Sequence, residues 1–340
     1  MDSGQSATVT VDINNGRAKI QIRRGTSLLA GLARNGLFLP SACGGNARCG
    51  YCKIKVIAPS APPSDRELPL LSKDEISAGT RLGCQTKPLG DIAIEIPPEI
   101  FFIKRFSGRV TRKALLTYDT LGLNIELTNP KSIEFTAGQY VQVKSMPYDG
   151  RDAVLRDFSI ASPPFEKSFV DLMIRRTKNG IFTGWAFDHL KEGDSVSFSG
   201  PYGTFRTSET DAPMLMVCGS TGLAPIWSML QDLVRKECRR SIRCFFGALT
   251  QKDLFMLEEL SRLESSLPDF RFIPALSNEP EGNGWTGERG LITDVVRRHV
   301  PDCSGFEAYL CGSPGMINAC VAVLTQYGMP AENIFFDKFA

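Results

Sequence analysis

Four cysteines constrain this chain more than any other feature of its sequence. Cys43, Cys49 and Cys52 stand in one glycine-rich loop, and Cys84 follows much further along the chain. A [2Fe–2S] cluster needs two thiolate ligands on each of its irons. The glycines of the loop allow positive φ angles and let backbone N–H groups approach the sulfurs closely. We therefore expect these four cysteines to hold a [2Fe–2S] cluster.

A structural zinc site is the alternative, because four thiolates also suit tetrahedral zinc. Zinc ribbons usually present two C-x-x-C pairs, whereas only Cys49 and Cys52 form one here. The loop resembles that of plant-type ferredoxins, which have four residues between the first two cysteines where this chain has five. The longer gap and the sequence Ser-Ala-Cys-Gly-Gly are more similar to those in the ferredoxin domain of the flavin subunit of bacterial sodium-pumping NADH:quinone reductases.

Length, charge and cysteine usage set broad limits. At 340 residues the chain has room for two or three domains. Its net charge of +2 favours neither nucleic acid nor an anionic membrane as a general partner. The other six cysteines show no disulfide spacing, which indicates a reducing compartment. Residues 1–6 do not read as a signal peptide, and no apolar run approaches the ~18 residues of a membrane span. We expect a cytoplasmic protein without a membrane anchor.

Residues 1–98 carry the pattern of a small α+β domain around the cysteine loop. Ser72 and Glu75 form a candidate capping box for a short helix just before Cys84. Alternating segments around an Asn-Asn-Gly turn predict a hairpin. The predicted strands are 8–13, 18–23, 54–58 and 92–96, with a first helix at 28–35. This order resembles the β-grasp fold of [2Fe–2S] ferredoxins.

Residues 104–207 are rich in short strands between turn residues, which predicts a small antiparallel β-barrel. The predicted strands are 108–111, 121–127, 138–143, 170–174 and 195–199. Within them stand Arg156-Asp-Phe-Ser159, a later Gly-Ile-Phe-Thr183 and a closing Gly-Pro-Tyr-Gly-Thr-Phe. These motifs resemble the FAD domain of the ferredoxin–NADP⁺ reductase superfamily.

That resemblance implies roles for individual residues of the segment. Arg156 would serve the flavin phosphate or ribityl chain, Ser159 the flavin ring, and Thr183 the pyrophosphate, which a helix N-terminus also favours. Where the superfamily has tyrosine this chain has Phe158, whose ring can pack against the flavin without the hydroxyl hydrogen bond. We therefore expect a more weakly held flavin. Ile174 and Gly180 complete the expected FAD-binding residues.

Residues 210–340 alternate buried strands with helical patterns, which predicts a doubly wound parallel α/β sheet. Gly219, Thr221 and Gly222 follow its first strand, where such sheets bind dinucleotides. A later Cys311-Gly312-Ser-Pro314-Gly-Met matches the superfamily's Cys-Gly-Pro-Pro-x-Met loop, and the Phe-Phe-Asp-Lys-Phe339 ending is close to that of oxygenase reductases. By this resemblance Cys311, Gly312, Pro314 and Phe339 would lie near the nicotinamide. The predicted strands are 214–217, 243–247, 271–275, 308–311 and 334–336, and the predicted helices are 226–236, 254–263, 291–299 and 316–327.

NADH is the expected coenzyme, because residues 246–253 hold one basic residue, Lys252, and lack the Arg or paired basic residues that a 2′-phosphate requires. In the expected mechanism, NADH passes hydride to FAD and the cluster then releases electrons singly. The chemistry belongs to the cofactors, so no side chain is expected to act as a catalytic acid or base. Ser159, Cys311 and Phe339 are expected near the reacting rings.

The order ferredoxin, FAD and NAD resembles the reductase components of bacterial multicomponent oxygenases. The resemblance implies an enzyme that passes electrons to an oxygenase hydroxylase component. The alternative is a soluble reductase of the NADH:quinone type or of the deoxysugar type. The non-enzyme alternative is a redox-sensing regulator that contains a flavin and an iron–sulfur cluster. Residues 1–98 hold 12 Lys and Arg against 8 Asp and Glu. We therefore expect an acidic docking surface on the acceptor.

Overall fold

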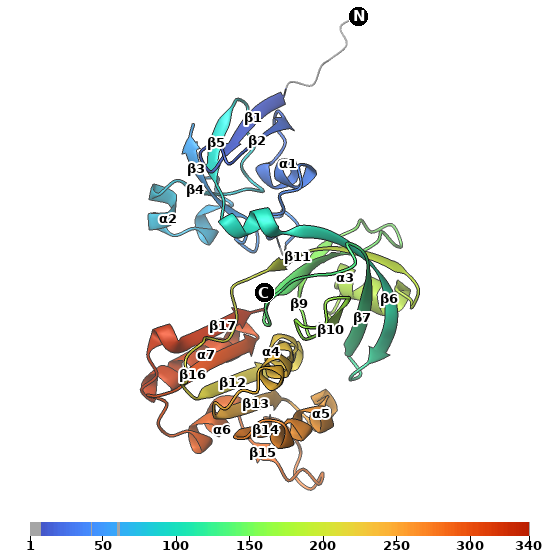
Figure 1. The fold of residues 1–340 in the computed structure, drawn as a ribbon, viewed down its shortest axis with the longest axis vertical. Coiled ribbons are helices and arrows are strands. Elements are labelled where there is room, and N and C mark those ends of the chain that lie inside the picture. The colour runs from blue at the N-terminus through green and yellow to red at the C-terminus, as the bar shows by residue number, and fades with distance from the viewer. Residues whose placement is uncertain (1–7, 42, 60–61, 340) are drawn as a thin grey trace, which may run out of the picture. The chain divides into compact units, whose positions relative to one another are not determined.

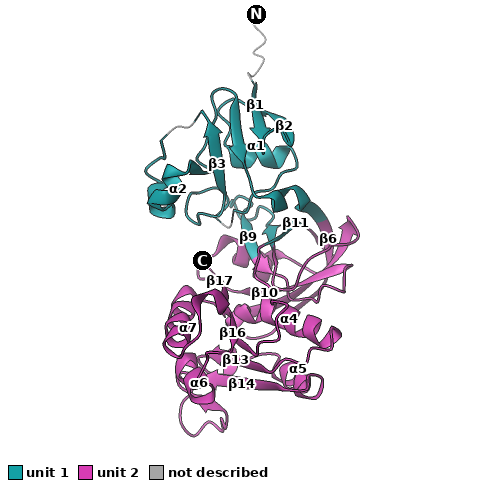
Figure 2. Ribbon diagram, turned by 60° about the vertical axis from the view of Figure 1, so that its left-hand side comes forward, with its two compact units in different colours: residues 1–106, 141–157, 197–202 teal, residues 107–140, 158–196, 203–340 magenta. Residues whose placement is uncertain are grey.

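The computed structural model describes residues 8–41, 43–59 and 62–339, which form two compact units (Figures 1 and 2). The first unit contains residues 1–106, 141–157 and 197–202, and the second contains residues 107–140, 158–196 and 203–340. The expectation that residues 1–6 are not a signal peptide lies outside the described residues. Each of the three predicted sheets is present.

The first sheet surrounds the cysteine loop with the strand order β2-β1-β5-β3-β4. β1 and β2 pair antiparallel, and β1 pairs parallel with β5. Asn14 and Asn15 both have positive φ in the turn between β1 and β2, as the Asn-Asn-Gly signal predicts. The elements are β1 (Thr8–Ile13), β2 (Ala18–Arg23), α1 (Leu28–Arg34), β3 (Lys53–Ala58), α2 (Lys73–Ser77), β4 (Thr80–Leu82) and β5 (Ile92–Glu95).

Side-chain hydrogen bonds cap the N-termini of α1 and α2, the two helices beside this sheet. Ser72 accepts a hydrogen bond from the Glu75 amide at 3.1 Å, and the Ser72 amide donates to the Glu75 carboxylate at 2.8 Å. The predicted capping box of α2 is therefore confirmed. Ser27 caps α1 by accepting from Ala30 N at 3.4 Å. The pattern misses β4 because a strand of three residues is too short to show alternation.

The second sheet has six strands in the order β10-β7-β6-β11-β8-β9. β7 pairs antiparallel with both β6 and β10, in agreement with the predicted antiparallel sheet. A short helical turn and a π-helical turn, Trp185–His189, lie where the helical run after Thr183 is predicted. The elements are β6 (Lys104–Leu115), β7 (Thr120–Asn129), β8 (Tyr140–Lys144), β9 (Leu155–Ser159), β10 (Phe169–Arg175), α3 (Ile181–Gly184) and β11 (Ser195–Tyr202).

The third sheet is parallel, with the order β15-β14-β13-β12-β16-β17. Met214, Met216 and Cys218 of β12 pack into the core beneath α4 and α5, while Leu215 and Val217 face α6 and α7 (Figure 1). Burial on both faces is what a doubly wound sheet requires. The elements are β12 (Met214–Gly219), α4 (Leu223–Arg235), β13 (Ile242–Ala248), α5 (Leu257–Arg262), β14 (Phe270–Leu276), β15 (Glu288–Arg289), α6 (Ile292–His299), β16 (Glu307–Gly312), α7 (Pro314–Gln326) and β17 (Ile334–Lys338).

Strand order reverses beside β12, since the chain moves outward through β13 and β14 and then returns to β16 on the other side. The crevice at the carboxyl ends of these strands is where open α/β sheets bind ligands. Within the second unit, α4 is tied to the segment after β9. Ser228 Oγ donates to Ser162 O at 2.7 Å, and Gln231 Nε2 donates to Ala161 O at 3.0 Å. The first turns of α4 therefore lie close to the end of β9.

Candidate functional site

The four predicted cluster ligands come together as two pairs of sulfurs in the first unit. Cys43 Sγ and Cys49 Sγ lie 3.4 Å apart. The Cys52 and Cys84 thiols are hydrogen-bonded to each other. No three Cys, His, Asp or Glu side chains within the described ranges meet as a group that could hold one metal ion. Two pairs of thiolates are the ligand set of a cluster of two irons, so the residues fit a [2Fe–2S] cluster.

Glycine and a serine shape the loop around these sulfurs. Gly45 has φ 89°, and a side chain there would also meet Leu29 at 3.3 Å. Ser41 Oγ accepts from Gly45 N at 2.9 Å, which fixes the entry to the loop. Gly83 N donates to Cys52 O at 2.7 Å, and this bond brings Cys84 to the loop from the end of β4.

Hydrogen bonds within the sulfur pairs act in opposite directions, because the bond between Cys52 and Cys84 raises the pKa of Cys52 and lowers that of Cys84. The hydrogen bond from Cys52 lowers the pKa of Cys84 to about 6, and Gln85 Nε2 also donates to Cys84 Sγ at 3.5 Å. Burial acts to raise the pKa of Cys43, but hydrogen bonds with the backbone of Arg48 and Cys49 bring it below its usual value. Backbone and side-chain donors around cluster sulfurs are also the groups that tune a cluster's potential.

β9 carries the residues expected at the flavin. Phe158 packs on Phe182 with ring centroids 4.8 Å apart, and Phe182 meets Trp185 edge-on at 5.2 Å. The Phe158 ring is therefore held in a cluster of three aromatic side chains. Arg156 is half-buried, and its Nη1 donates to Leu155 O at 2.6 Å. Ser159 is buried at the end of the strand.

The turn into α3 brings Gly180 and Thr183 together as predicted. Thr183 Oγ1 accepts from Thr177 N at 3.2 Å and lies 3.4 Å from Gly180 O. A side chain at Gly180 would come within 2.5 Å of that hydroxyl oxygen. The Thr183 hydroxyl thus shapes the turn. Ile174 is buried in β10 opposite Leu121, so it can offer a cofactor its backbone more readily than its side chain.

A contact that the sequence pattern does not predict joins Ser159 to the last strand. The Ser159 side chain is hydrogen-bonded to Asp337 of β17. Burial raises the pKa of the Asp337 carboxyl to about 6, and the bond to Ser159 partly offsets that rise. The sequence carries a signal for this residue, because Asp337 is a lone acid two residues before Phe339, which is expected near the nicotinamide.

The two predicted coenzyme loops pack directly against each other. A side chain at Gly222 would lie 2.2 Å from Cys311 O, and one at Gly219 would lie 2.9 Å from Met316 Sδ. Thr221 lies between those glycines in a short helical turn. Glycine lets the backbone at these two positions approach the loop after β16 this closely. The packing against that loop is therefore a reason for glycine at both positions. The dinucleotide backbone can then lie close to the chain on this surface.

The loop after β16 and the end of β17 complete this surface. Ser313 caps α7, whose first residue is Pro314, and Phe339 N donates to Gly312 O at 3.0 Å. Cys311 pairs with Asp337 across β16 and β17. Cys311 has no exposed surface, and burial raises its pKa well above the usual range. Its thiol is therefore packed rather than nucleophilic.

Carboxylates hold the turn after β13. Glu279 accepts from Gln251 N and from Gln251 Nε2, both at 2.8 Å, and the side-chain bond is the main cause of its lowered pKa. Asp253 accepts from the Tyr118 hydroxyl of the β6–β7 turn at 2.9 Å. These carboxylates lie beyond the carboxyl ends of β13 and β14, where an acidic side chain can bind a ribose 2′-hydroxyl.

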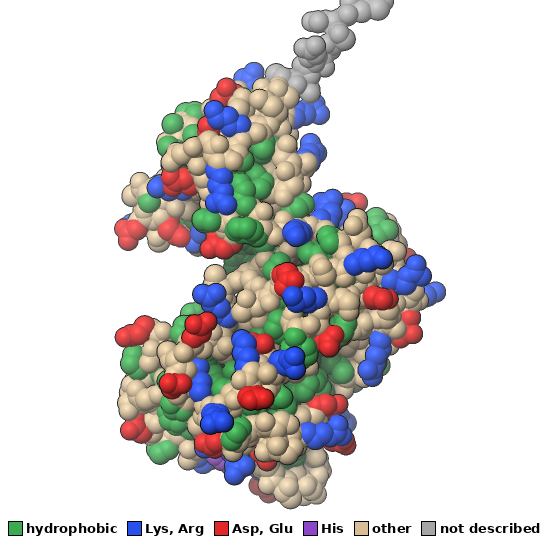
Figure 3. Space-filling model, viewed as in Figure 1, with side chains coloured by type: hydrophobic (Ala, Val, Ile, Leu, Met, Phe, Trp, Pro, Cys, Tyr) green, Lys and Arg blue, Asp and Glu red, His purple; other side chains and the backbone are tan. Residues whose placement is uncertain are grey.

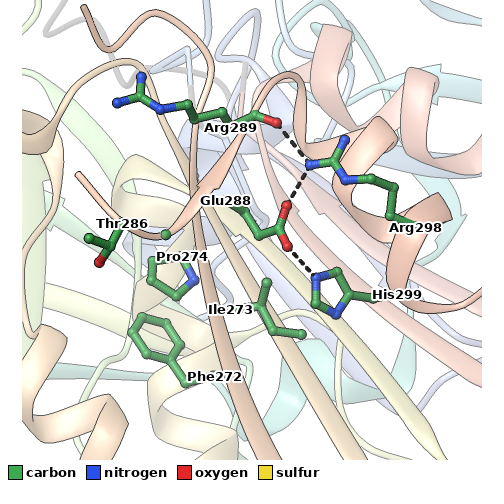
Figure 4. Close-up of a pocket in the computed structure, with 9 residues that line it drawn as sticks. Phe272, Ile273, Pro274, Thr286, Glu288, Arg289, Arg298 and His299 are labelled. Carbon is green, nitrogen blue, oxygen red and sulfur yellow. Dashed lines mark hydrogen bonds and ion pairs between the residues drawn. The ribbon is translucent and has the colours of Figure 1, made fainter. Parts of the chain in front are cut away.

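An open pocket of about 520 Å³ lies elsewhere, beside the edge strand β15 (Figure 4). Residues 272–274 of β14 line one side, and Arg298 and His299 point toward Glu288 on the other. Glu288 Oε2 accepts from Arg298 Nη2 at 2.5 Å, and Glu288 Oε1 is hydrogen-bonded to His299 Nε2 at 2.7 Å. The pocket follows the middle of β14 rather than the loops at the strand ends, so it does not coincide with the predicted coenzyme site.

The wider surface carries both signs of charge. Lys and Arg side chains are interspersed with Asp and Glu on the face that Figure 3 shows. All ten cysteines lie within the described residues, and each of them is a free thiol. Across residues 8–41, 43–59 and 62–339, none of the helices combines the length and the apolar character that crossing a membrane requires.

Three family models match the chain in sequence order. They are the 2Fe-2S iron-sulfur cluster binding domain at residues 11–89, the oxidoreductase FAD-binding domain at 107–207 and the oxidoreductase NAD-binding domain at 216–322. These matches confirm the predicted fold class and the three predicted cofactors. The first match also decides for an iron–sulfur cluster and against the zinc alternative.

Proteins of the same domain order are similar along almost the whole chain. The xylene/toluene monooxygenase electron transfer component XylA of Pseudomonas putida is 30% identical, over 97% of this chain and 93% of its own. A subunit of the Na⁺-translocating NADH-quinone reductase of Methylococcus capsulatus is 29% identical, over 96% of this chain and 90% of its own. The solved structure of the Amycolatopsis cytochrome P450 reductase GcoB has a TM-score of 0.79 and 29% identity, over 98% of this chain and 99% of its own.

Proposed function

We propose that this chain, which belongs to the family of iron–sulfur flavoprotein reductases that includes XylA, carries electrons from NADH to the hydroxylase component of an oxygenase. The domains proposed for this function are residues 1–98 for the cluster, 104–207 for FAD and 210–340 for NADH. The observation that carries the proposal is the presence of two cysteine pairs in one unit and of two interlocked coenzyme loops in the other.

The proposed coenzyme and flavin residues have separate tasks. Bound FAD supplies the exchange between two-electron and one-electron chemistry. Arg156 serves its phosphate or ribityl chain. Thr183, in the turn that begins at Gly180, serves its pyrophosphate. Phe158, which packs on Phe182, supports its ring. Gly219, Thr221 and Gly222, together with Gly312 and Pro314, form the surface on which the dinucleotide lies. Ile174 contributes backbone to the flavin side.

Ser159 and Asp337 add a proton path that the sequence motifs do not predict. The Ser159 hydroxyl is hydrogen-bonded to a carboxyl whose pKa of about 6 lies near the working range of a cytoplasmic enzyme. Ser159 Oγ can therefore pass a proton between the edge of the flavin and Asp337. Cys311 lies opposite Asp337 across β16 and β17, and Phe339 N donates to Gly312 O of the neighbouring loop.

The oxygenase acceptor is supported by the relatives. XylA is the electron transfer component of a monooxygenase, and GcoB is named as the reductase of a cytochrome P450. The test is NADH oxidation by the full chain with a purified hydroxylase component encoded beside it. Substrate hydroxylation that needs this chain, and stops when the chain is omitted, would establish the function. Reduction of quinones in place of any hydroxylase would contradict it.

The quinone alternative keeps one specific observation in its favour. The five-residue gap between Cys43 and Cys49 is similar to that of the sodium-pump subunit, and the Methylococcus capsulatus protein of that kind matches this chain over 96% of its length. A ubiquinone analogue supplied to the full chain distinguishes the two acceptors. Steady turnover of any acceptor with NADH would exclude a redox sensor without enzymatic activity.

We also propose that the acceptor docks through an acidic surface. Counted without the cluster, residues 1–98 carry a net charge of +4. Opposite charges accelerate association most at low ionic strength, and salt screens them. Electron transfer to the hydroxylase component should therefore slow as salt rises from about 10 to about 150 mM. A rate that does not fall over that range would contradict an acidic docking surface.

A further inference from the structure

Glu67 is a buried carboxylate in the cluster domain that none of the predicted roles uses. Its exposed fraction is 3%. One oxygen, Oε2, accepts from Ser64 N at 2.8 Å and from Ser64 Oγ at 2.9 Å. The other, Oε1, accepts from Leu82 N at 2.7 Å in a buried hydrogen bond. Burying a carboxylate costs free energy that such donors offset, so its position here needs a reason.

The first link between Glu67 and the cluster site runs through β4. Leu82 is the last residue of β4, and Cys84 follows two positions later. Gly83 between them donates to Cys52 O at 2.7 Å and accepts from Leu29 N at 2.9 Å. The backbone that leads to Cys84 is thus held by Glu67 at Leu82 and by Cys52 at Gly83.

The second link runs through the turn that contains Glu67, residues 64–70. Backbone bonds from Glu67 N to Ser64 O and from Leu70 N to Glu67 O, each 2.9 Å long, fold this turn. Its last residue, Leu70, lies against Gly50, where an added side-chain carbon would be 3.6 Å from Leu70 Cβ. Gly50 stands between Cys49 and Cys52. The turn therefore lies against the C-x-x-C segment.

The buried arginine of β4 donates hydrogen bonds to backbone carbonyls beside α2. Arg81, also buried, is the neighbour of Leu82 on β4. Its Nη1 donates to Thr80 O at 2.6 Å and to Ile76 O at 3.3 Å, beside α2. The three donors that Glu67 accepts from, two amides and a hydroxyl, are neutral groups. Its negative charge is therefore stabilised without being cancelled by those bonds.

We propose that Glu67 is a positioning residue for the cluster, which holds Cys84 in place and lowers the cluster's reduction potential. Adding an electron to the cluster is disfavoured by a nearby negative charge, and burial reduces the screening of that charge. The proposal concerns the cluster alone and is independent of which protein accepts the electrons.

The test is an EPR-monitored redox titration of the loaded full chain. Glu67→Gln keeps the shape of the side chain and removes the charge. Its ratio of reduced to oxidised cluster at a fixed potential should rise about tenfold, which is about 59 mV for a one-electron couple. The matched control is Glu95→Gln, because Glu95 is a surface carboxylate of the same sheet that pairs with Lys55 at 3.2 Å. It should leave the ratio within about twofold of that of the original protein.

Two results would overturn the proposal. One is a Glu67→Gln protein with an intact EPR spectrum and an unshifted potential. The other is a Glu67→Asp protein, which keeps the charge, with a shift as large as that of Glu67→Gln. If Glu67→Gln binds no cluster, Glu67→Asp tests the positioning role in its place. The shorter side chain of Glu67→Asp reaches Leu82 N less well. Iron release from it to a chelator should be faster than from Glu95→Gln, and equal rates would exclude the positioning role.

Discussion

The hydroxyl of Ser159 on β9 is hydrogen-bonded to the carboxyl of Asp337 on β17, which joins the expected flavin site to the last strand of the coenzyme-binding sheet. Asp337 also pairs with Cys311 of β16. One carboxyl therefore reaches both sites between which hydride is expected to pass. Its pKa of about 6, raised by burial, lets it change protonation near neutral pH.

Electron transfer to the cluster should depend on pH through Asp337. Deprotonated Asp337 can take, through Ser159, the one proton that remains once both electrons of a hydride have left, so the rate should fall below a pH of about 6. Asp337→Asn should lower the rate by about 100-fold and abolish this pH dependence. Stopped-flow cluster reduction by NADH between pH 5 and 8 measures it. An Asp337→Asn protein with an unchanged profile would show that the carboxyl carries no proton.

Replacing Cys84, the fourth expected cluster ligand, should affect the reduction of two electron acceptors differently. Cys84→Ser removes one of the paired thiolates, so NADH-dependent reduction of cytochrome c should fall at least tenfold while ferricyanide reduction through the flavin is kept. Cys238→Ser is a matched control, because Cys238 is a half-buried thiol outside the cluster domain. Equal loss of both activities in Cys84→Ser would mean that the cluster is structural.

Coenzyme choice should respond to Glu279. Its carboxylate is held by Gln251 beyond the carboxyl ends of β13 and β14, where it would repel a 2′-phosphate. Glu279→Gln should raise kcat/KM for NADPH about tenfold, or 1.4 kcal/mol, and change that for NADH much less. Glu258→Gln on the exposed face of α5 is the control. If both variants use NADPH equally poorly, Glu279 does not select the coenzyme.

A buried ion pair should govern acid stability of the second unit. Arg240 and Glu307 meet at 2.6 Å with side chains 9% and 6% exposed, and Tyr309 also donates to Glu307 at 2.8 Å. Burial acts to raise the pKa of Glu307, but bonds from Ser208 and Arg240 bring it down to about 2 from 4.5. The stability from this shift is present above pH 4.5 and is lost as pH falls toward 2.

Breaking the pair leaves a buried charge without its partner. Arg240→Met should lower the free energy of unfolding by about 3 to 5 kcal/mol at pH 7. Arg240→Met combined with Glu307→Leu should recover most of that loss, since no charge is then left buried. Urea unfolding of the three proteins gives the values. If the double variant is no more stable than Arg240→Met, the lower free energy of unfolding comes from lost packing rather than from the unpaired charge.

Local patterns predict most elements of this fold. The Asn-Asn-Gly hairpin and the Ser72 capping box depend on residues close in sequence, and both are present. The parallel sheet joins distant strands, but the alternation of buried strands and helices that predicts it is itself a local pattern, and the sheet is present as well. The cysteine ligands were predictable for the same reason, because spacing and residue type carry the chemistry.

Features that arise from distant contacts could not be predicted in this way. The Ser159–Asp337 bond needs β17 to lie beside β16, and the Glu67 bond to Leu82 needs the 64–70 turn to fold onto β4. The short edge strands β4 and β15, of three and two residues, are recognised only by their hydrogen bonds to the neighbouring strands β3 and β14. No periodicity marks such short segments.

The pairing of Cys52 with Cys84 has a mechanical consequence. These two ligands lie about 30 residues apart in the chain, and the segment between them holds β3, α2 and β4. A cluster held by both thiolates would close that segment into a ring and would remove much of the freedom that the segment has when unfolded. The cluster would then also act as a cross-link. Losing it through oxidation or chelation should loosen this part of the domain in the same event, so iron content and folding of residues 53–83 should be lost together.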